Sequence, residues 1–239
     1  MTAVAHRTPR EVRRSPNIWD HPDIYEVEMA AFDRDGRVDA ALAELMGGAG
    51  GRAVDIGCGT GQALPGLARL LGPAGRVVGV EPHPGLAAAA ARRTRHLPGV
   101  SVRTGTAQHL PLPDASVRLA HARWAYFFGP GCEPGLAEVA RVVRRGGLAV
   151  VIDNDATTST FGSWFRRHLP DYDPAAVERF WARQGWTRRP VLTAWRFAQR
   201  ADLERVVRIE LRPEVADAVL AEHTGLEVDY AVNLWWRRY

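Results

Sequence analysis

The fold of this chain is decided by the stretch Val54-Asp55-Ile56-Gly57-Cys58-Gly59-Thr60-Gly61, in which a short apolar run passes into three alternate glycines. Alternate glycines let the backbone turn tightly and approach a ligand with no Cβ in the way. Many α/β folds hold a nucleotide-like cofactor with a strand, a glycine-rich loop and a helix in this order. The stretch therefore predicts an α/β fold with a cofactor site at the loop.

The acid and the glycine spacing bear on which cofactor the loop could hold. A phosphate site needs backbone N–H groups and no nearby anion, whereas a carboxylate such as Asp55 suits a cationic group. Gln62 stands where the pattern G-x-G-x-x-G requires its third glycine, and the chain contains no lysine that could act as a Walker lysine. Phosphate cofactors are disfavoured, and the alternatives are a purely structural glycine turn or a variant nucleotide loop.

This stretch resembles the first signature motif of class I S-adenosylmethionine-dependent methyltransferases, acid-x-Gly-x-Gly-x-Gly. Its four defining residues are Asp55, Gly57, Gly59 and Gly61. The resemblance implies that S-adenosylmethionine is the cofactor and that the loop, Cys58 included, passes close to its methionine part. It also implies that Asp55 orients the zwitterionic amino-acid end.

A second strand is expected at Arg76–Glu81, with Pro82 and an alanine-rich helix over 84–95 after it. Glu81 comes about twenty residues after the last loop glycine, where an acid accepts hydrogen bonds from vicinal ribose hydroxyls. An adenosine ribose is common to NAD and S-adenosylmethionine. Glu81 therefore supports a nucleoside ligand without separating the two cofactors.

The stretch 105–117, Gly-Thr-Ala-Gln-His-Leu-Pro-Leu-Pro-Asp-Ala-Ser-Val, resembles the small-molecule branch typified by ubiquinone and menaquinone biosynthesis methyltransferases. The resemblance implies that Thr106, Ala107 and Gln108 meet the adenine ring. Thr106 departs from the pattern, because an aspartate is common at that position and a hydroxyl binds the adenine amino group more weakly.

A fourth strand is expected at 117–122, and Arg123-Trp124-Ala125-Tyr126-Phe127-Phe128 follows it. This is the strand end at which a transferred group meets its acceptor in such a fold, and Arg123 is a candidate to contact the cofactor. The Asn-Pro-Pro-aromatic tetrad and the Pro-Cys nucleophile of nucleobase methyltransferases are both missing. Arg118 stands at a position where the family usually has an aspartate, so the charge there is reversed.

The catalytic residues are left open by the sequence. His121, Asp155 and His168 are candidates for a general base, and Asp153 could also accept a proton or bind the substrate. Each of them could instead be structural. A metal site is not expected, because catechol methyltransferases need an acid where this chain has Arg123.

Composition limits the remaining functions. The chain has 239 residues, 46% of them hydrophobic, with a net charge of +4 and two cysteines. All 31 basic residues are arginine, which by itself raises the isoelectric point, so no nucleic-acid partner is expected. No apolar run reaches the length of about 20 residues that spans a bilayer, and the arginine-rich N-terminus lacks the apolar run of a secretory signal. We expect a cytoplasmic protein; its oligomeric state is open, with a homodimer as one option.

We expect one domain over residues 1–239, built on a Rossmann-like, seven-stranded, mostly parallel sheet with an antiparallel last strand, helices on both faces and a helical lid. Its expected parts are an N-terminal helical cap (17–46), a cofactor-binding core (50–155), a substrate-lid insert (156–188) and closing strands and helices (189–239). Tyr25 and Trp19 of the cap are candidates to line the pocket. The insert carries the aromatic and histidine residues Trp164, Phe165, His168, Tyr172, Phe180, Trp181 and Trp186. Aromatic walls suit an apolar or planar substrate, although the same rings could simply pack the core.

The expected function is methyl transfer from S-adenosylmethionine to a small-molecule acceptor. The alternatives are a different reaction with the same cofactor, such as cyclisation or decarboxylation, and a non-catalytic module that binds the cofactor. The sequence identifies neither the acceptor nor the atom that is methylated.

Overall fold

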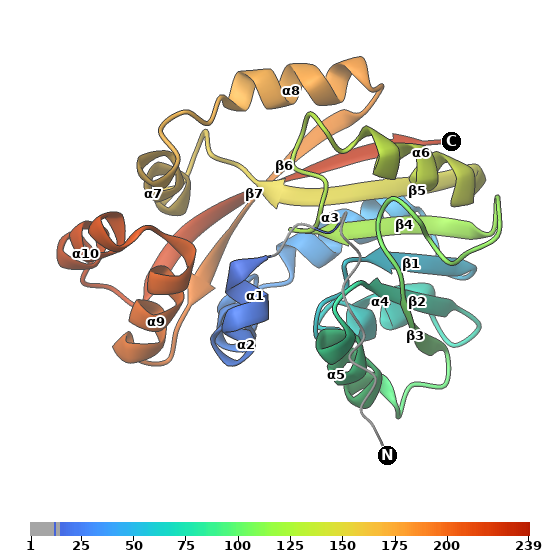
Figure 1. Ribbon diagram of the computed structural model, residues 1–239, viewed down its shortest axis with the longest axis horizontal. Helices are drawn as coiled ribbons and strands as arrows, with labels where there is room; N and C mark the ends of the chain where they lie inside the picture. The colour runs from blue at the N-terminus through green and yellow to red at the C-terminus, as the bar shows by residue number, and fades with distance from the viewer. Residues whose placement is uncertain (1–11, 13–14) are drawn as a thin grey trace. The chain divides into compact units, whose positions relative to one another are not determined.

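The computed structural model describes Val12 and residues 15–239 (Figure 1). The arginine-rich stretch on which the argument about a secretory signal rests lies outside the described residues. The chain divides into two compact units. The first unit contains Met46–Val151 and Arg237–Tyr239, and the second contains Ser15–Leu45 and Ile152–Trp236.

One seven-stranded sheet has the strand order β3-β2-β1-β4-β5-β7-β6. Its strands are β1 (Arg52–Ile56), β2 (Arg76–Glu81), β3 (Val100–Thr104), β4 (Val117–Arg123), β5 (Val143–Asn154), β6 (Thr187–Arg196) and β7 (Glu227–Arg238). The pairs β1–β2, β1–β4 and β2–β3 are parallel, and β6–β7 is antiparallel. This confirms the predicted Rossmann-like fold with a mostly parallel sheet and an antiparallel end.

In the first unit, buried apolar strands are connected by short helices. β1 and β2 are buried along their length after an exposed first residue, as expected of strands that are covered on both faces. The helices are α4 (Leu64–Leu71), α5 (Pro84–Thr94) and α6 (Glu133–Val142). α4 packs on β1 and β2, and α5 on β2 and β3. Each of the three helices has a proline in its first turn, where the missing N–H costs nothing.

Two boundaries in the first unit differ from the prediction. From the sequence alone a helix is expected from about Gln62 to Leu71; it begins at Leu64, because Pro65 has no N–H with which to continue the helical hydrogen bonds back to Gly61. The sequence also predicts a helix over 134–144 and a strand over 148–152; the helix ends at Val142, and the strand already begins at Val143.

The longer strand β5 has a local cause. Its Gly146 N–H donates to the carbonyl of Tyr239, and the Tyr239 N–H donates to the carbonyl of Gly147. Tyr239 thus pairs with both glycines, and Gly146 takes part in the strand with a positive φ of +74°. The glycines lie inside the strand instead of ending the helix, which the sequence could not show because their partner is almost a hundred residues away.

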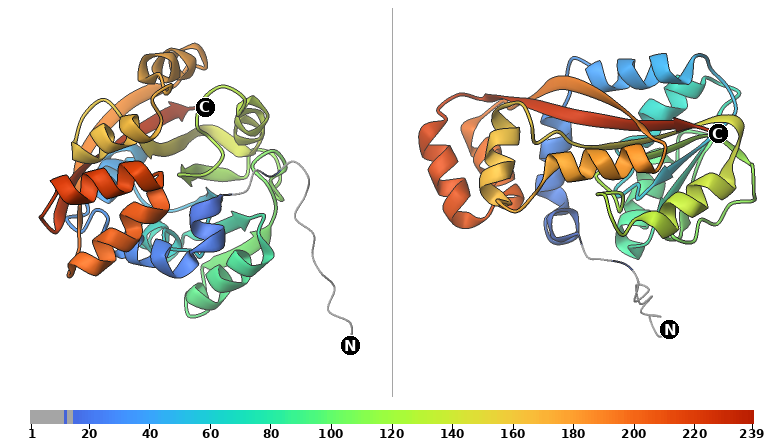
Figure 2. Two further views of the ribbon diagram at one scale, coloured as in Figure 1. Left: turned by 60° about the vertical axis from the view of Figure 1, so that its left-hand side comes forward. Right: turned by 90° about the horizontal axis from the view of Figure 1, so that it is seen from above.

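The second unit holds the remaining helices. They are α1 (Pro16–Asp20), α2 (Pro22–Ala31), α3 (Arg37–Met46, of which Met46 belongs to the first unit), α7 (Thr160–His168), α8 (Pro174–Arg183), α9 (Arg200–Glu210) and α10 (Pro213–Glu222). From Asn17 the sequence predicts a turn that runs into a helix up to about Phe32; the expected turn is itself the short helix α1, and Pro22 separates it from α2 by disfavouring helical backbone at His21, which has φ −132°. α2 packs against α9, and α9 against α10 (Figure 2).

Aromatic rings form the core of the second unit. Phe161 stacks on Tyr230 with ring centroids 4.3 Å apart, and Trp181 stacks on Trp235 at 5.7 Å. The rings of Trp164, Phe180, Trp181 and Trp186 are buried. For these four residues of the insert, the structure supports core packing over an exposed substrate wall. The role of residues 156–188 as a lid stays a prediction.

Among the described residues, no helix combines the length and the apolar character that a bilayer span requires. Both cysteines, Cys58 and Cys132, are buried and free.

Candidate cofactor site

The glycine loop is anchored to the end of β2. The N–H groups of Gly57 and Cys58 both donate to the carbonyl of Val80, at 2.8 and 3.1 Å, and the Gly61 N–H donates to the carbonyl of Cys58 at 2.8 Å. The three loop glycines have φ values of +72°, +55° and +84°, a region that L side chains rarely adopt. The loop is therefore a fixed turn at the carboxyl end of β1 and β2.

Two loop glycines are also required by close packing. A Cβ at Gly57 would lie closer than 3.0 Å to the Cβ of Ala125, and a Cβ at Gly61 would lie 3.0 Å from Cα and Cβ of Ala90 in α5. The glycine loop therefore contacts the segment that follows β4 at Gly57, and it packs against α5 at Gly61. The sequence indicated that glycines were needed here, but Ala125 was not foreseen as the residue that excludes a side chain.

The side chain of Cys58 faces the interior. A Cβ at Gly79 in β2 would lie 2.8 Å from the Cys58 Sγ, so the thiol occupies the space over this glycine. Burial is the main cause that raises the pKa of the Cys58 thiol, and the nearby carboxylates of Asp55 and Glu81 raise it further. A protonated, buried thiol is a packing group. A cofactor contact of Cys58 would have to come from its backbone.

Asp55 forms a buried pair with His121. The two residues are register partners on the parallel strands β1 and β4. The Asp55 Oδ1 lies 2.7 Å from the His121 Nδ1, and the two side chains are only 4% and 3% exposed. Because a carboxylate can only accept a hydrogen bond, the histidine donates from Nδ1. Asp55, the acid of the motif, and His121, one of the three candidate bases, are thus joined in one buried hydrogen-bonded pair.

Glu81 connects the loop to the end of β2. Its Oε2 accepts a hydrogen bond from the Gly59 N–H and its Oε1 accepts one from the His83 N–H, both at 2.9 Å. Burial raises the pKa of Glu81, while these two backbone donors oppose the shift. A carboxylate has about four acceptor sites, so two backbone bonds leave acceptor capacity on Glu81. In the sequence, Pro82 lies between Glu81 and His83, which provides the second N–H donor.

The segment after β3 meets the same strand end. The Gly105 N–H donates to the carbonyl of Glu81 at 3.4 Å, and Thr106 forms an isolated bridge with His109. Thr106 and Ala107 are buried, while Gln108 is half-buried. The predicted adenine residues therefore lie on a tight turn beside the acid predicted to hold the ribose.

The segment after β4 is strained and aromatic. Trp124 and Tyr126 have φ values of +48° and +58°, a conformation that costs about 1–3 kcal/mol per non-glycine residue and tends to occur at functional sites. The Arg123 guanidinium lies 5.3 Å from the centre of the Trp124 ring. Phe127 is buried, while Phe128 is 52% exposed. Together with the packing of Ala125 on Gly57, this gives the strand end an aromatic border.

Arg118 has a role that sequence reasoning missed. Its guanidinium donates to the backbone carbonyls of Met46, Ala49 and Gly50. The reversed charge on β4 therefore binds the glycine-rich segment that enters β1. A cation in the expected β4 strand was the available signal in the sequence.

The other candidate residues lie in the second unit, each in its own local network. Asp155 accepts hydrogen bonds from Thr157 and from the Arg188 guanidinium, the latter at 2.9 Å. The His168 Nδ1 accepts from the Arg212 N–H at 2.9 Å, and burial lowers the pKa of His168. Both arrangements are ones that a structural residue would show.

Asp153 and Tyr25 complete the predicted set. Burial raises the pKa of Asp153 to about 7, and its Oδ1 accepts from the Asn154 N–H at 2.8 Å. Tyr25 lies on α2 of the second unit, so its contact with the cofactor stays a prediction. The described residues contain no cluster of three or more histidine, cysteine or acidic side chains that could hold a metal ion.

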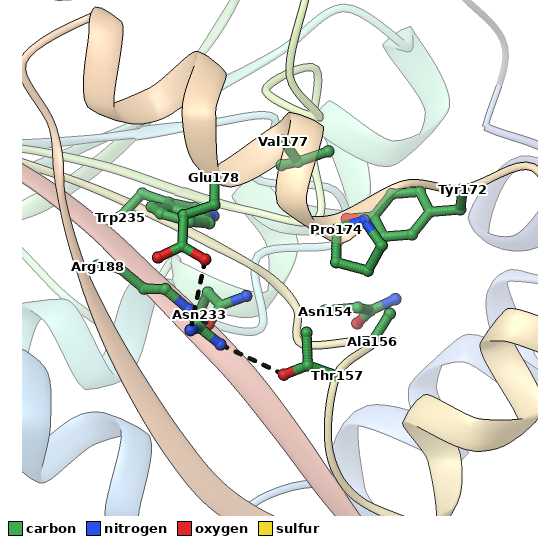
Figure 3. Close-up of a pocket in the computed structure, with 10 residues that line it drawn as sticks. All are labelled: Asn154, Ala156, Thr157, Tyr172, Pro174, Val177, Glu178, Arg188, Asn233 and Trp235. Atoms are coloured by element: carbon green, nitrogen blue, oxygen red, sulfur yellow. Dashed lines mark hydrogen bonds and ion pairs between the residues drawn. The ribbon is translucent and has the colours of Figure 1, made fainter.

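A small pocket lies in the second unit, at the end of β5 and under α8 (Figure 3). It is partly open to solvent and has both polar and apolar walls. The Arg188 guanidinium binds Asp155 and Asn233 and lies 3.8 Å from Glu178. Two carboxylates thus lie beside the Arg188 guanidinium, so this positive charge is already paired and the pocket is polar.

Comparison with known proteins gives a match in the first unit. Residues 53–147 match a family described as a methyltransferase domain. The chain is 32% identical over 163 residues to a 37.1 kDa protein of transposon TN4556 from Streptomyces fradiae, covering 65% of this chain and 45% of that protein. It is 34% identical over 103 residues to demethylmenaquinone methyltransferase from Desulfitobacterium hafniense, covering 42% of this chain and 41% of that enzyme. The chain thus spans less than half of the curated relatives it matches.

Solved structures with the same fold cover more of the chain. A S-adenosylmethionine-dependent methyltransferase from Aquifex aeolicus has a TM-score of 0.59 at 17% identity, covering 93% of this chain and 99% of that one. Geranyl diphosphate C-methyltransferase from Streptomyces coelicolor has a TM-score of 0.52 at 19% identity, covering 82% and 77%. At these identities the likeness establishes the fold alone.

Proposed function

We propose that the chain transfers a methyl group from S-adenosylmethionine to a small-molecule acceptor, because residues 53–147 match a family described as a methyltransferase domain. The observation that carries the proposal is the pair of buried carboxylates at the glycine loop. Glu81 binds the loop through the Gly59 N–H, and Asp55 lies at the end of the strand that leads into it. Two buried acids beside a glycine turn disfavour phosphate and suit hydroxyl and ammonium donors.

The residues of the first unit fit the parts of this cofactor. Glu81 would accept hydrogen bonds from the ribose hydroxyls with its remaining lone pairs. Thr106, Ala107 and Gln108 would border the adenine ring, and Asp55 would receive the cationic amino group. The backbone of Gly57, Cys58, Gly59 and Gly61 would pass along the amino-acid part, with Arg123 and Pro82 at the border of the site. The bound cofactor supplies an activated methyl group on a sulfonium.

The protein would then position the acceptor and exclude water, which are the main tasks in such a transfer. The strained aromatic segment 124–128 lies next to the glycine loop through the contact of Ala125 with Gly57. We propose that this segment borders the acceptor and that the acceptor is apolar or aromatic. A general base is required only if the acceptor carries a proton, and Asp155 and His168 stay candidates for it. With both cysteines free, the proposal includes a reducing, cytoplasmic location.

Titration calorimetry with S-adenosylmethionine and S-adenosylhomocysteine tests cofactor binding. We expect the wild type to bind both, and Asp55→Asn and Glu81→Gln each to weaken binding by about tenfold or more, because each removes a charge-assisted hydrogen bond. Asp114→Asn is the matched control, since this carboxylate of the same unit is 80% exposed. Failure of the wild type to bind either ligand would reject the proposal.

Product mass separates methyl transfer from its alternatives. Methylation adds one CH₂ to the acceptor and releases S-adenosylhomocysteine, whereas decarboxylation or cyclisation gives other products. A module that only binds the cofactor would show tight binding and no turnover on a panel of small molecules that includes quinols and prenyl compounds.

A further inference from the structure

We propose that His121 is a positioning residue, which fixes the carboxylate of Asp55 for the cationic amino-acid end of the cofactor. The inference rests on the proposed function, because it assigns a ligand to Asp55. It differs from the expectation that His121 is a general base.

The pair is set by strand register. Asp55 and His121 occupy partner positions on the parallel strands β1 and β4, so their side chains leave the sheet side by side. The 2.7 Å separation of Oδ1 and Nδ1 is that of a strong, charge-assisted hydrogen bond. Each residue is 66 positions from the other in the chain, and only the pairing of the strands brings them together.

The surroundings make this hydrogen bond costly to lose. The flanking residues Ile56, Ala120 and Ala122 are buried and apolar, and water has almost no access to either polar side chain. A buried carboxylate without its donor would pay a large desolvation cost. His121 therefore fixes both the position of Asp55 and the direction of its remaining lone pairs.

An aspartate–histidine pair can serve either partner. The carboxylate can hold the imidazole for proton transfer, or the imidazole can hold the carboxylate for a cation. Asp55 is the member on β1, the strand that leads directly into the glycine loop, and it lies two residues before Gly57. A cationic ammonium group must be bound in every turnover, whereas a base is needed only for protonated acceptors. These points favour the second option, in which the imidazole of His121 holds the carboxylate of Asp55 for a cation.

Three variants distinguish a positioning role of His121 from a general base and from a purely structural role. His121→Asn keeps a donor near the position of Nδ1, His121→Gln moves the donor outward, and His121→Leu removes it. Calorimetry with two ligands provides the readout: S-adenosylhomocysteine carries the amino-acid end, and 5′-methylthioadenosine lacks it. Thermal melting of each variant checks that it is folded.

We expect His121→Leu and His121→Gln to lower the affinity for S-adenosylhomocysteine by about 10- to 100-fold, the range for a hydrogen bond to a charged group. His121→Asn should keep most of the wild-type affinity. Binding of 5′-methylthioadenosine should change by less than about twofold, since it makes no contact with Asp55.

An equal loss for both ligands would overturn the inference in favour of a structural role. Unchanged S-adenosylhomocysteine affinity, with a fall in turnover and loss of the acidic limb of the pH–rate profile, where the rate rises with pH, would overturn it in favour of a general base. If the wild type binds neither ligand, the proposed function itself fails, and this inference with it.

Discussion

We expect Asp153→Asn to remove a large part of the pH dependence of this protein's stability. The carboxyl group is buried at the end of β5, and burial raises its pKa from 3.8 to about 7. Between these two values the folded protein keeps a proton that the unfolded chain releases. The free energy of unfolding therefore falls as the pH rises from about 4 to about 7, and the group contributes most in its protonated form.

The size of the effect follows from the two pKa values. Each unit of difference is worth about 1.4 kcal/mol, so the wild type should lose about 3 kcal/mol between about pH 5 and about pH 8 through this group alone. Asparagine has nearly the same shape, can still accept from the Asn154 N–H and does not titrate. The variant should accordingly gain about 3 kcal/mol relative to the wild type over that range.

Urea unfolding of both proteins at several pH values measures this difference. Burial also raises the pKa of Glu210 to about 7, so Glu210 titrates over the same range, but it does so in both proteins and largely cancels. Asp171→Asn, which changes an exposed carboxylate, is the control and should show no such trend. A difference between wild type and Asp153→Asn that stays constant within about 0.5 kcal/mol across the range would refute the reasoning.

Two further predictions concern the first unit. Gly57→Ala should lower the free energy of unfolding by more than about 2 kcal/mol and abolish S-adenosylhomocysteine binding, because the new Cβ meets Ala125 and the backbone has positive φ. The control Gly225→Ala adds a Cβ with ordinary contacts. It should change neither the melting temperature nor the ligand affinity measured by calorimetry. Arg118→Leu should lower the free energy of unfolding by about 1–3 kcal/mol, since three backbone carbonyls lose their donor. Denaturant unfolding beside the exposed control Arg144→Ala measures this, and equal stability of the two variants would contradict the assigned role.

Much of the fold could be predicted because its signals are local. β1 and β2 are short apolar runs with an acid at or next to their last residue, and the helices α4, α5 and α6 each have a proline in the first turn. The start of β5 depended on a distant partner. β5 begins early because Tyr239 pairs with Gly146 and Gly147, which no local pattern records.

The roles of the insert residues could not be read from the sequence either. Apolar rings at helical spacing fit a substrate wall and a core equally well, since both require aromatic surface. Only packing separates them, and the stacking of Trp181 on Trp235 puts that ring in the core of the second unit.

By itself, the sequence determined that a glycine loop follows a buried strand and that Asp55 and Glu81 lie at the ends of two strands beside it, from which we predicted a nucleoside cofactor with a cationic end. Backbone turns and strand ends are governed by neighbouring residues, so these features are visible in a single stretch. The tertiary structure decided what holds that loop and its acid. Strand pairing sets His121 against Asp55 and packs Ala125 on Gly57, because the order of strands in a sheet depends on contacts between residues far apart in the chain.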